Sequence, residues 1–215
     1  MRSSSNRRWN WLVMPDTRYG NEKSKYCYPG SNVLINHYDI KDEKQLTALE
    51  TMFTAQRLAE LQSNPIEGDF DLRHLQRIHA RLFSDLYPFA GEIRTENITK
   101  DGFSFAQARF IHDAAEPIFQ QLMREDWKSM NRVQVVEKLV YYMSEINVLH
   151  PFREGNGRSL REFIRCIALE AGYGLDWSAV PPEVIFQASV QSVKDMSALA
   201  QVISQSLTTY QKPSA

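Results

Sequence analysis

The segment 150–161, HPFREGNGRSLR, brings together side chains that could accept a proton and bind an anion. Its first residue, His150, can act as a base, and its last, Arg161, follows Arg158 by three positions. Arginine suits phosphate because its planar guanidinium group matches the spacing of phosphate oxygens. A histidine close to two such cations is expected to stay neutral and ready to accept a proton. The segment therefore indicates transfer of a phosphate-containing group, with His150 as the base.

Between the histidine and the arginines lies the run Glu154-Gly155-Asn156-Gly157. Glycines permit positive φ angles and let the main chain approach a ligand closely. A helix that begins here would present unpaired N–H groups and a dipole that favour an anion. A polyphosphate would repel the Glu154 carboxylate unless that carboxylate bound Mg²⁺. This ion takes one or two carboxylates together with phosphate oxygens. We therefore expect Glu154 to bind Mg²⁺ beside a triphosphate.

The simpler alternative is a Gly-Asn-Gly turn that only connects two helices, with both arginines in solvent. Such a connector accounts for the glycines. It leaves the histidine, the carboxylate and the spacing of the arginines unexplained, so we favour a site.

Two predicted helices position this segment. Apolar residues recur at helical spacing between 136 and 146, which predicts a helix over 133–149 that carries His150 at its end. Pro151 ends this helix because the residue before a proline avoids helical geometry. A second helix is predicted over 157–172. The glycine run is then a tight loop that opens onto the N-terminus of the second helix.

The same periodicity predicts further helices over 42–62, 72–82, 107–126 and 182–209, the last with two halves that can be separate. Short β-prone runs around Asp101-Gly102 predict a hairpin over 96–106. Residues 1–38 are rich in Ser, Asn, Arg, Tyr, Pro and Gly without a sustained period, which predicts an irregular tail and arm. We expect one all-α domain over 39–210 that carries a small β-hairpin.

Composition narrows the class of protein. The 215 residues are 43% hydrophobic, with a formal net charge of -1 and a pI of about 6.5. This balance gives no sign of direct binding to nucleic acid, and no apolar run reaches the length of a membrane span. Cys27 and Cys166 have no metal-binding spacing and are expected to be free thiols in a reducing compartment. The short apolar stretch after the basic N-terminus does not resemble a signal peptide, so a cytoplasmic protein without membrane contact is expected.

Other polar and aromatic residues are assigned to packing or to the surface. His74 and His79 lie five positions apart on a helix and do not share a face, so a zinc site is not expected there. We expect His79 in the core, and His74 and His112 at the surface. Aromatic residues near the N-terminus could stack on bases, but no basic patch accompanies them, which favours an arm packed on the domain: Trp9, Trp11, Tyr26 and Tyr28.

The segment 150–161 resembles the signature of the Fic proteins, H-P-F-x-[D/E]-G-N-G-R-x-x-R, at every fixed position. The similarity extends upstream to FDLRHLQRIHARLFSDLYPFAGEIR and covers roughly residues 32–200. The resemblance implies a Fic-type helical fold with a hairpin flap. It also implies transfer of AMP from ATP to a hydroxyl side chain of a target protein.

The resemblance also assigns roles to residues of this sequence. His150 would be the base and Glu154 the Mg²⁺ ligand. The anion hole would consist of Gly155, Asn156 and Gly157. Arg158 and Arg161 would bind the β- and γ-phosphates. The flap that holds the target segment by strand addition would comprise Thr99, Lys100, Gly102, Phe103, Ser104 and Phe105. More loosely, the adenine pocket would include Gln187, Ser189 and Asp195.

Two other functions remain open. A phosphate transfer like that of the Doc proteins is disfavoured, because Doc has a lysine where this chain has Gly157. A non-catalytic nucleotide-binding or interaction protein is disfavoured because no residue of the signature is lost. The resemblance to small bacterial Fic toxins suggests a type II topoisomerase subunit as the first target and a separate small antitoxin as the restraint.

Fic enzymes are often inhibited by a glutamate in a segment [S/T]-x-x-x-E-[G/N], which pairs with the second arginine of the signature. Residues 63–68, SNPIEG, match this pattern. The inhibitory segment is helical, whereas Pro65 and Gly68 lie where the first helix is ending. We therefore expect the match to be a coincidence, with Glu67 exposed and Arg161 accessible.

Overall fold

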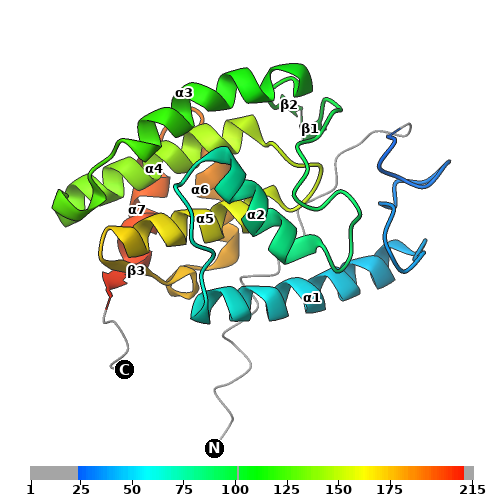
Figure 1. Ribbon diagram of the computed structural model, residues 1–215, viewed down its shortest axis with the longest axis horizontal. Helices are drawn as coiled ribbons and strands as arrows, with labels where there is room; N and C mark the ends of the chain where they lie inside the picture. The colour runs from blue at the N-terminus through cyan, green and yellow to red at the C-terminus, as the bar shows by residue number, and fades with distance from the viewer. Residues whose placement is uncertain (1–23, 101, 211–215) are drawn as a thin grey trace, which may run out of the picture.

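The computed structural model describes residues 24–100 and 102–210, and the fold over these residues is mainly helical (Figure 1). Most of the predicted helices are present within a few residues of the expected bounds. The helices are α1 (Glu43–Ser63), α2 (Leu72–Phe83), α3 (Ile111–Met123), α4 (Arg132–Leu149), α5 (Asn156–Glu170), α6 (Pro182–Gln191) and α7 (Ser197–Ser206), with short 3-10 turns η3 (Ala108–Phe110), η4 (Trp127–Ser129) and η5 (Trp177–Ala179).

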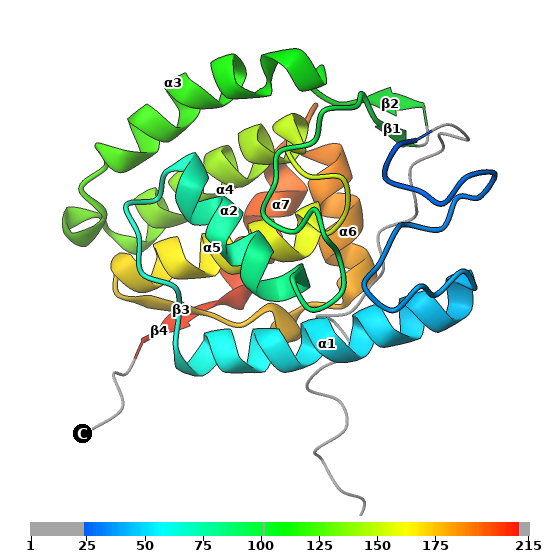
Figure 2. The same cartoon turned by 45° about the vertical axis from the view of Figure 1, so that its right-hand side comes forward.

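Helix α5 lies in the centre of the molecule, between α1, α2 and α4 in both views (Figures 1 and 2). It packs against α4, α2 and the strand that follows it. Its buried residues include polar ones near its start, such as Arg158 and Ser159, as well as the apolar Phe163 and Ile167. The segment 150–161 therefore joins two core helices rather than lying on the surface.

Side chains fix where several helices begin. The Asp42 carboxylate accepts a hydrogen bond from the Gln45 N–H at the start of α1, and Asp71 does the same for His74 at the start of α2. Helix α4 begins with a reciprocal capping box between Asn131 and Gln134. Helix α5 differs, because Gly155 precedes it and supplies no capping side chain.

Two small antiparallel sheets accompany the helices. Strands β1 (Thr99–Lys100) and β2 (Phe103–Ser104) form the predicted hairpin, with Gly102 at φ 80° in its turn. Asp101, the other turn residue, lies outside the described residues. The second sheet pairs β3 (Tyr173–Leu175) with β4 (Leu207–Thr209).

The prediction of helix as far as residue 209 was therefore wrong. Helix α7 ends at Ser206, and the chain continues in extended geometry from Leu207. Leu207 pairs with Leu175, and both side chains are buried. This long-range pairing outweighs the local preference for another helical turn.

Part of the predicted N-terminal arm packs on the helices. Tyr26, Cys27, Val33 and Leu34 are buried members of the main core. The Ser24 hydroxyl donates a hydrogen bond to the Glu96 carboxylate at 2.7 Å. The packed-arm interpretation is confirmed for Tyr26, which is buried, and for Tyr28, which packs against the core, whereas Trp9 and Trp11 lie outside the described residues. A domain boundary at residue 39 stays a prediction.

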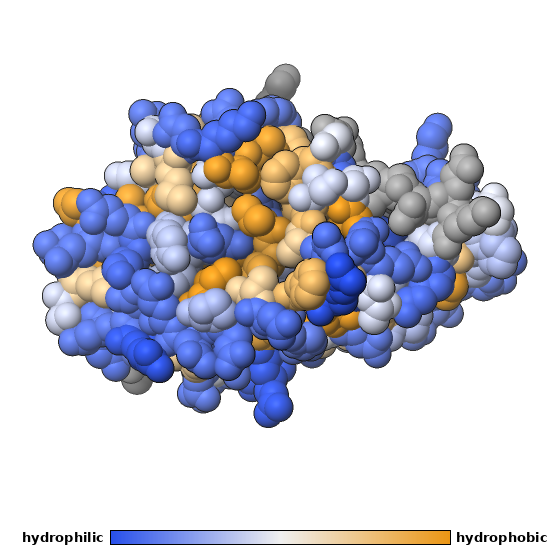
Figure 3. Space-filling view, turned by 90° about the horizontal axis from the view of Figure 1, so that it is seen from above, coloured by the Kyte–Doolittle hydropathy of each residue, from blue (hydrophilic) through white to orange (hydrophobic). Residues whose placement is uncertain are grey.

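Both cysteines, Cys27 and Cys166, are free, as the sequence predicted, and both are buried. Among the described helices, none combines the length and the hydrophobicity that crossing a membrane requires. Figure 3 shows hydrophobic side chains gathered across the middle of one face of the molecule, with hydrophilic side chains around them.

Candidate active site

His150 ends helix α4 in a left-handed conformation, with φ 46° and ψ 60°. Its Nδ1 lies 3.1 Å from the Asn147 carbonyl oxygen. Because a carbonyl only accepts hydrogen bonds, Nδ1 carries the proton in this arrangement, and Nε2 is the nitrogen that can accept one. The imidazole stacks on Phe105, with ring centroids 3.8 Å apart. The histidine is thus oriented by its own helix and by the flap residue that follows β2.

The loop after His150 is closed by Asn156. The Asn156 amide oxygen accepts from the Phe152 N–H at 2.8 Å, and the amide nitrogen donates to the Phe152 carbonyl at 2.8 Å. Gly155 lies at φ 75°, and a Cβ built there would meet the Phe83 ring at 2.2 Å. Asn156 therefore shapes the loop through its side chain, and α5 starts directly at this turn.

Glu154 is 3% exposed, and its carboxylate accepts a hydrogen bond from the Gly155 N–H at 2.9 Å. Its main-chain carbonyl accepts from Nε2 of His79 at 2.8 Å, while Nδ1 of His79 accepts from the Gly91 N–H at 2.8 Å. These two bonds define a neutral His79, and burial lowers the pKa of that imidazole to about 3. The predicted core position of His79 is confirmed, and its imidazole anchors the main chain of Glu154.

The two arginines of the signature lie in different surroundings. Arg158 is 2% exposed, and its Nη2 binds the Glu50 carboxylate of α1 at 2.7 Å. The same atom lies 3.7 Å from the Glu154 carboxylate. Arg161 is only partly buried and lines the pocket described next. The structure thus brings Arg161 to the pocket and engages Arg158 in a buried ion pair.

A pocket of about 350 Å³ lies between the flap, α4, α5 and α6. Its volume is within the usual range for small-molecule sites. His150, Gly157 and Arg161 line it, together with the flap residues Lys100 and Phe103. Lys100 lies 5.1 Å from the centre of the Phe186 ring, across the space between the flap and α6. The remaining lining residues are Phe105, Met143, Asn147, Leu160, Ser189, Val190, Gln191, Val193 and Lys194.

The three residues loosely predicted for the adenine pocket do not lie together. Ser189 lines the pocket, and its hydroxyl donates to the Ile185 carbonyl at 2.8 Å. Gln187 is exposed, does not line the pocket, and donates to Glu183 at 2.8 Å. Asp195 is also exposed and accepts from the Ser197 N–H at 2.9 Å. The structure brings only Ser189 of these three residues to the pocket.

Sequence reasoning missed Glu50. This carboxylate is buried in α1 and binds both Arg158 and the Tyr87 hydroxyl. A signal was present, because Glu50 and Thr54 continue the four-residue spacing between Leu46 and Leu58 on the apolar face of the helix. Polar residues on such a face require buried partners.

The prediction that His74 lies at the surface was wrong. His74 is buried, and its Nε2 lies 2.8 Å from the Ile66 carbonyl oxygen. Its ring also packs edge-on against Phe163 of α5. Burial lowers the pKa of the His74 imidazole. The loop between α1 and α2 covers this side chain, which helical periodicity alone does not reveal. His112 is exposed, as predicted.

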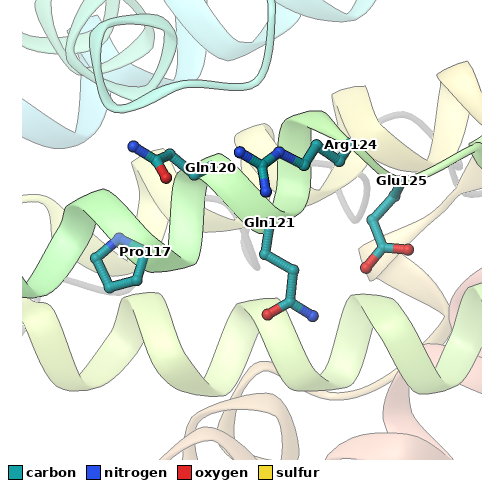
Figure 4. A pocket seen from close by; sticks show the side chains of 5 residues that line it. All are labelled: Pro117, Gln120, Gln121, Arg124 and Glu125. Carbon is teal, nitrogen blue, oxygen red and sulfur yellow. The ribbon is translucent and has the colours of Figure 1, made fainter.

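A second hollow lies on α3, away from the segment 150–161. Figure 4 shows its lining side chains, with Gln121 and Glu125 directed toward α4. The Glu125 carboxylate accepts hydrogen bonds from Lys138 and Tyr142 at 2.6 Å each. These bonds stabilise the packing of α3 on α4, so we place the site in the flap pocket.

Comparison with known proteins identifies the family of this chain. The model of the Fic/DOC family matches residues 69–168, from just before α2 to the last turns of α5. Over 176 residues the chain is 42% identical to protein adenylyltransferase VbhT of Bartonella schoenbuchensis, covering 81% of this chain and 37% of that protein. It is 31% identical over 189 residues to the probable protein adenylyltransferase Fic of Escherichia coli K12, covering 87% and 94%. The chain belongs to the Fic/DOC family.

Solved structures share the fold. BepC of Bartonella tribocorum with bound AMPPNP has a TM-score of 0.81 at 21% identity, covering 86% of this chain and 97% of that chain. The N-terminal Fic domain of a Bartonella quintana effector with bound ADP has a TM-score of 0.81 at 24% identity, covering 86% and 95%. The predicted all-α Fic-type fold is confirmed. VbhT is named a protein adenylyltransferase and the Escherichia coli protein a probable one, and this activity belongs to the nucleotidyltransferases.

Proposed function

We propose that this protein transfers AMP from ATP to a serine, threonine or tyrosine hydroxyl of a target protein. The observation that carries the proposal is the meeting of His150, Gly157 and Arg161 in one pocket, at the start of a helix that has no capping side chain. The names of the relatives and the nucleotides bound in BepC and in the Bartonella quintana domain support the same activity.

In the proposed reaction, His150 Nε2 accepts the proton of the target hydroxyl. The hydroxyl oxygen attacks the α-phosphorus of ATP, a new P–O bond forms, and the bond from the α-phosphorus to the bridging oxygen breaks. Pyrophosphate leaves. The N–H groups at the start of α5 and the Arg161 guanidinium stabilise the negative charge that develops on the phosphates. Loop residues Gly155 and Asn156 hold these N–H groups in position.

A single buried carboxylate beside this loop fits Mg²⁺, because phosphate oxygens and water supply the other ligands of that ion. Glu154 is the residue that would hold it, and the ion would offset the charge of the phosphates. Among the described residues, no group of three or more His, Cys, Asp and Glu side chains forms a separate metal site. Arg158 contributes through its contacts with Glu50 and Glu154 and, in this arrangement, supports the loop from the core.

We assign target docking to the flap. Strands β1 and β2 form a sheet of only two strands, so another strand can pair with an outer edge. Thr99, Phe103 and Ser104 are exposed, and Phe105 connects the hairpin to the His150 ring. A segment paired with this edge would bring a hydroxyl toward the base.

The test is transfer of label from α-labelled ATP to proteins of a bacterial lysate by wild type and by His150→Ala. We expect the variant to lose transfer by about 10²–10⁴-fold, the usual contribution of a general base, and to keep nucleotide binding. His112→Ala, which removes an exposed histidine on α3, is the matched control and should retain activity.

The position of the label separates the alternatives. Transfer from γ-labelled but not α-labelled ATP would indicate a Doc-like phosphotransferase. Nucleotide binding without transfer from either position, with every lysate tested, would indicate a non-catalytic binding protein. A purified type II topoisomerase subunit is the first defined target to test, because the small bacterial Fic toxins that the chain resembles modify such subunits.

We further propose that a separate small antitoxin restrains the protein. Helix α1 ends at Ser63, and Glu67 is exposed in the loop that follows. The Glu67 carbonyl accepts a hydrogen bond from Arg77 of α2, which anchors this loop outside a helix. An internal inhibitory helix over residues 63–68 is therefore not the favoured restraint.

A further inference from the structure

Arg94 lies in the segment between α2 and the flap and is 1% exposed. Its guanidinium group donates hydrogen bonds to main-chain carbonyls. Nε donates to the His150 carbonyl at 2.8 Å, and Nη2 donates to the Leu149 carbonyl at 3.3 Å. Nη1 donates to the Glu96 carbonyl at 2.6 Å, and Nη2 also donates to the Ala106 carbonyl at 2.6 Å. One buried cation thus connects three stretches of main chain.

The first stretch is the end of α4. The last carbonyls of a helix lack partners within the helix, and the helix dipole favours a cation there. The Arg94 guanidinium supplies both a hydrogen-bond donor and a positive charge to the carbonyls of Leu149 and His150. The main-chain N–H of Arg94 donates to the Pro151 carbonyl at 2.9 Å. His150 is not a glycine, so its left-handed backbone costs free energy and persists only where neighbours hold it. Arg94 is one of these neighbours.

The other two stretches are the stems of the flap. Glu96 comes shortly before β1, and Ala106 comes shortly after β2. The Ala106 N–H also donates to the Val148 carbonyl of α4 at 3.2 Å. The guanidinium therefore binds the start of the flap, the end of the flap and the carbonyl of the catalytic histidine at the same time.

We propose that Arg94 is a positioning residue that fixes the flap relative to His150 and so sets the distance between the docked hydroxyl and the base. The inference rests on the proposed AMP transfer. Arg94 does not line the pocket, so it acts through the main chain of His150 and of the flap stems. Its loss should slow transfer without weakening nucleotide binding, because none of the hydrogen bonds of its guanidinium goes to α5, whose start is held by Asn156.

The experiment compares Arg94→Lys with wild type. Lysine keeps the positive charge, but its ammonium group is a point charge and cannot span four carbonyls as the planar guanidinium does. A displacement of about 1 Å in a reacting group can cost about 10²-fold in rate. We expect kcat for transfer into the acceptor found with wild type to fall by about that factor. The dissociation constant for ATP should stay within about threefold of wild type, a change of less than about 1 kcal/mol.

Arg57→Lys is the control. Arg57 also makes several charged hydrogen bonds, to Asp85 and Glu60, but it lies on α1 away from the flap. This variant should lose stability and keep kcat. Hydrogen exchange supplies a readout that does not depend on activity: in Arg94→Lys, amides of residues 99–104 should exchange faster, whereas those of α2 and the middle of α5 should not.

Full turnover in Arg94→Lys would overturn the proposal. A parallel increase of exchange in the flap, α2 and α5, or loss of the folded state in both Arg94→Lys and Arg94→Gln, would assign the residue to general stability and overturn it as well. Failure of the proposed function would look different, because wild type itself would transfer no label. Hydrogen exchange of the flap amides in wild type and in Arg94→Lys would then still decide whether Arg94 holds the flap.

Discussion

Replacement of Gly155 by alanine tests whether the loop depends on close packing as well as on backbone geometry. The residue lies at φ 75°, where a non-glycine residue costs about 1–2 kcal/mol. The added Cβ would also lie 2.2 Å from Cζ of Phe83, a buried ring on α2. Overpacking of a core of this kind costs about 1–3 kcal/mol. We therefore expect Gly155→Ala to lower the free energy of unfolding by about 2–5 kcal/mol.

The matched control is Gly172→Ala at the other end of the same helix. Gly172 lies at φ 81°, but a Cβ there would meet nothing within 4 Å, so only the backbone cost of about 1–2 kcal/mol applies. Urea denaturation at constant m value measures both free energies of unfolding. Adding Phe83→Leu to Gly155→Ala should recover part of the extra loss of unfolding free energy relative to Gly172→Ala. Equal losses in the two alanine variants would refute the packing argument.

Three further predictions concern the site and its supports. Glu154→Gln should weaken Mg²⁺-dependent transfer, and excess Mg²⁺ should partly restore it; full wild-type activity after removal of metal with a chelator would contradict the assignment. Glu67→Gly should leave the transfer rate unchanged, because this side chain is exposed outside a helix, and a large increase would show that the restraint is internal. His79 has a pKa of about 3 in the folded protein and about 6.5 when unfolded, so its contribution to stability is present above pH 6.5 and is lost as the pH falls toward 3. Between pH 7 and pH 5 the wild type should lose about 2 kcal/mol more than His79→Gln, and parallel curves of unfolding free energy against pH would contradict this.

Local sequence patterns predicted most of the helices and the loop of the site. The apolar periodicity before His150, together with Pro151, placed the end of α4 at the correct residue. The Asp-Gly pair placed the flap hairpin correctly. These features depend on residues close together in the chain, which is why a sequence can predict them.

Features that depend on distant partners were not predicted. The pairing of Arg158 with Glu50, which lies 108 positions away, is one example, and the assignment of Arg158 to a phosphate stays a prediction. The strand after α7 exists because Leu207 pairs with Leu175 across the second sheet. The hydrogen bond from Arg94 to the carbonyl of the left-handed His150 likewise spans 56 positions.

The two buried thiols make the protein suitable for measurements of local opening without added labels. Cys27 lies in the packed arm and Cys166 in the central helix α5, so they belong to different parts of the core. Burial and the neighbouring Glu162 raise the pKa of the Cys166 thiol, which keeps it protonated and unreactive in the closed protein. An alkylating reagent can modify either thiol only when its surroundings open, so the rate of modification at each site reports the free energy of opening there. Mass spectrometry of two peptides would then show, in one experiment, whether the arm detaches while α5 stays closed or whether both open together.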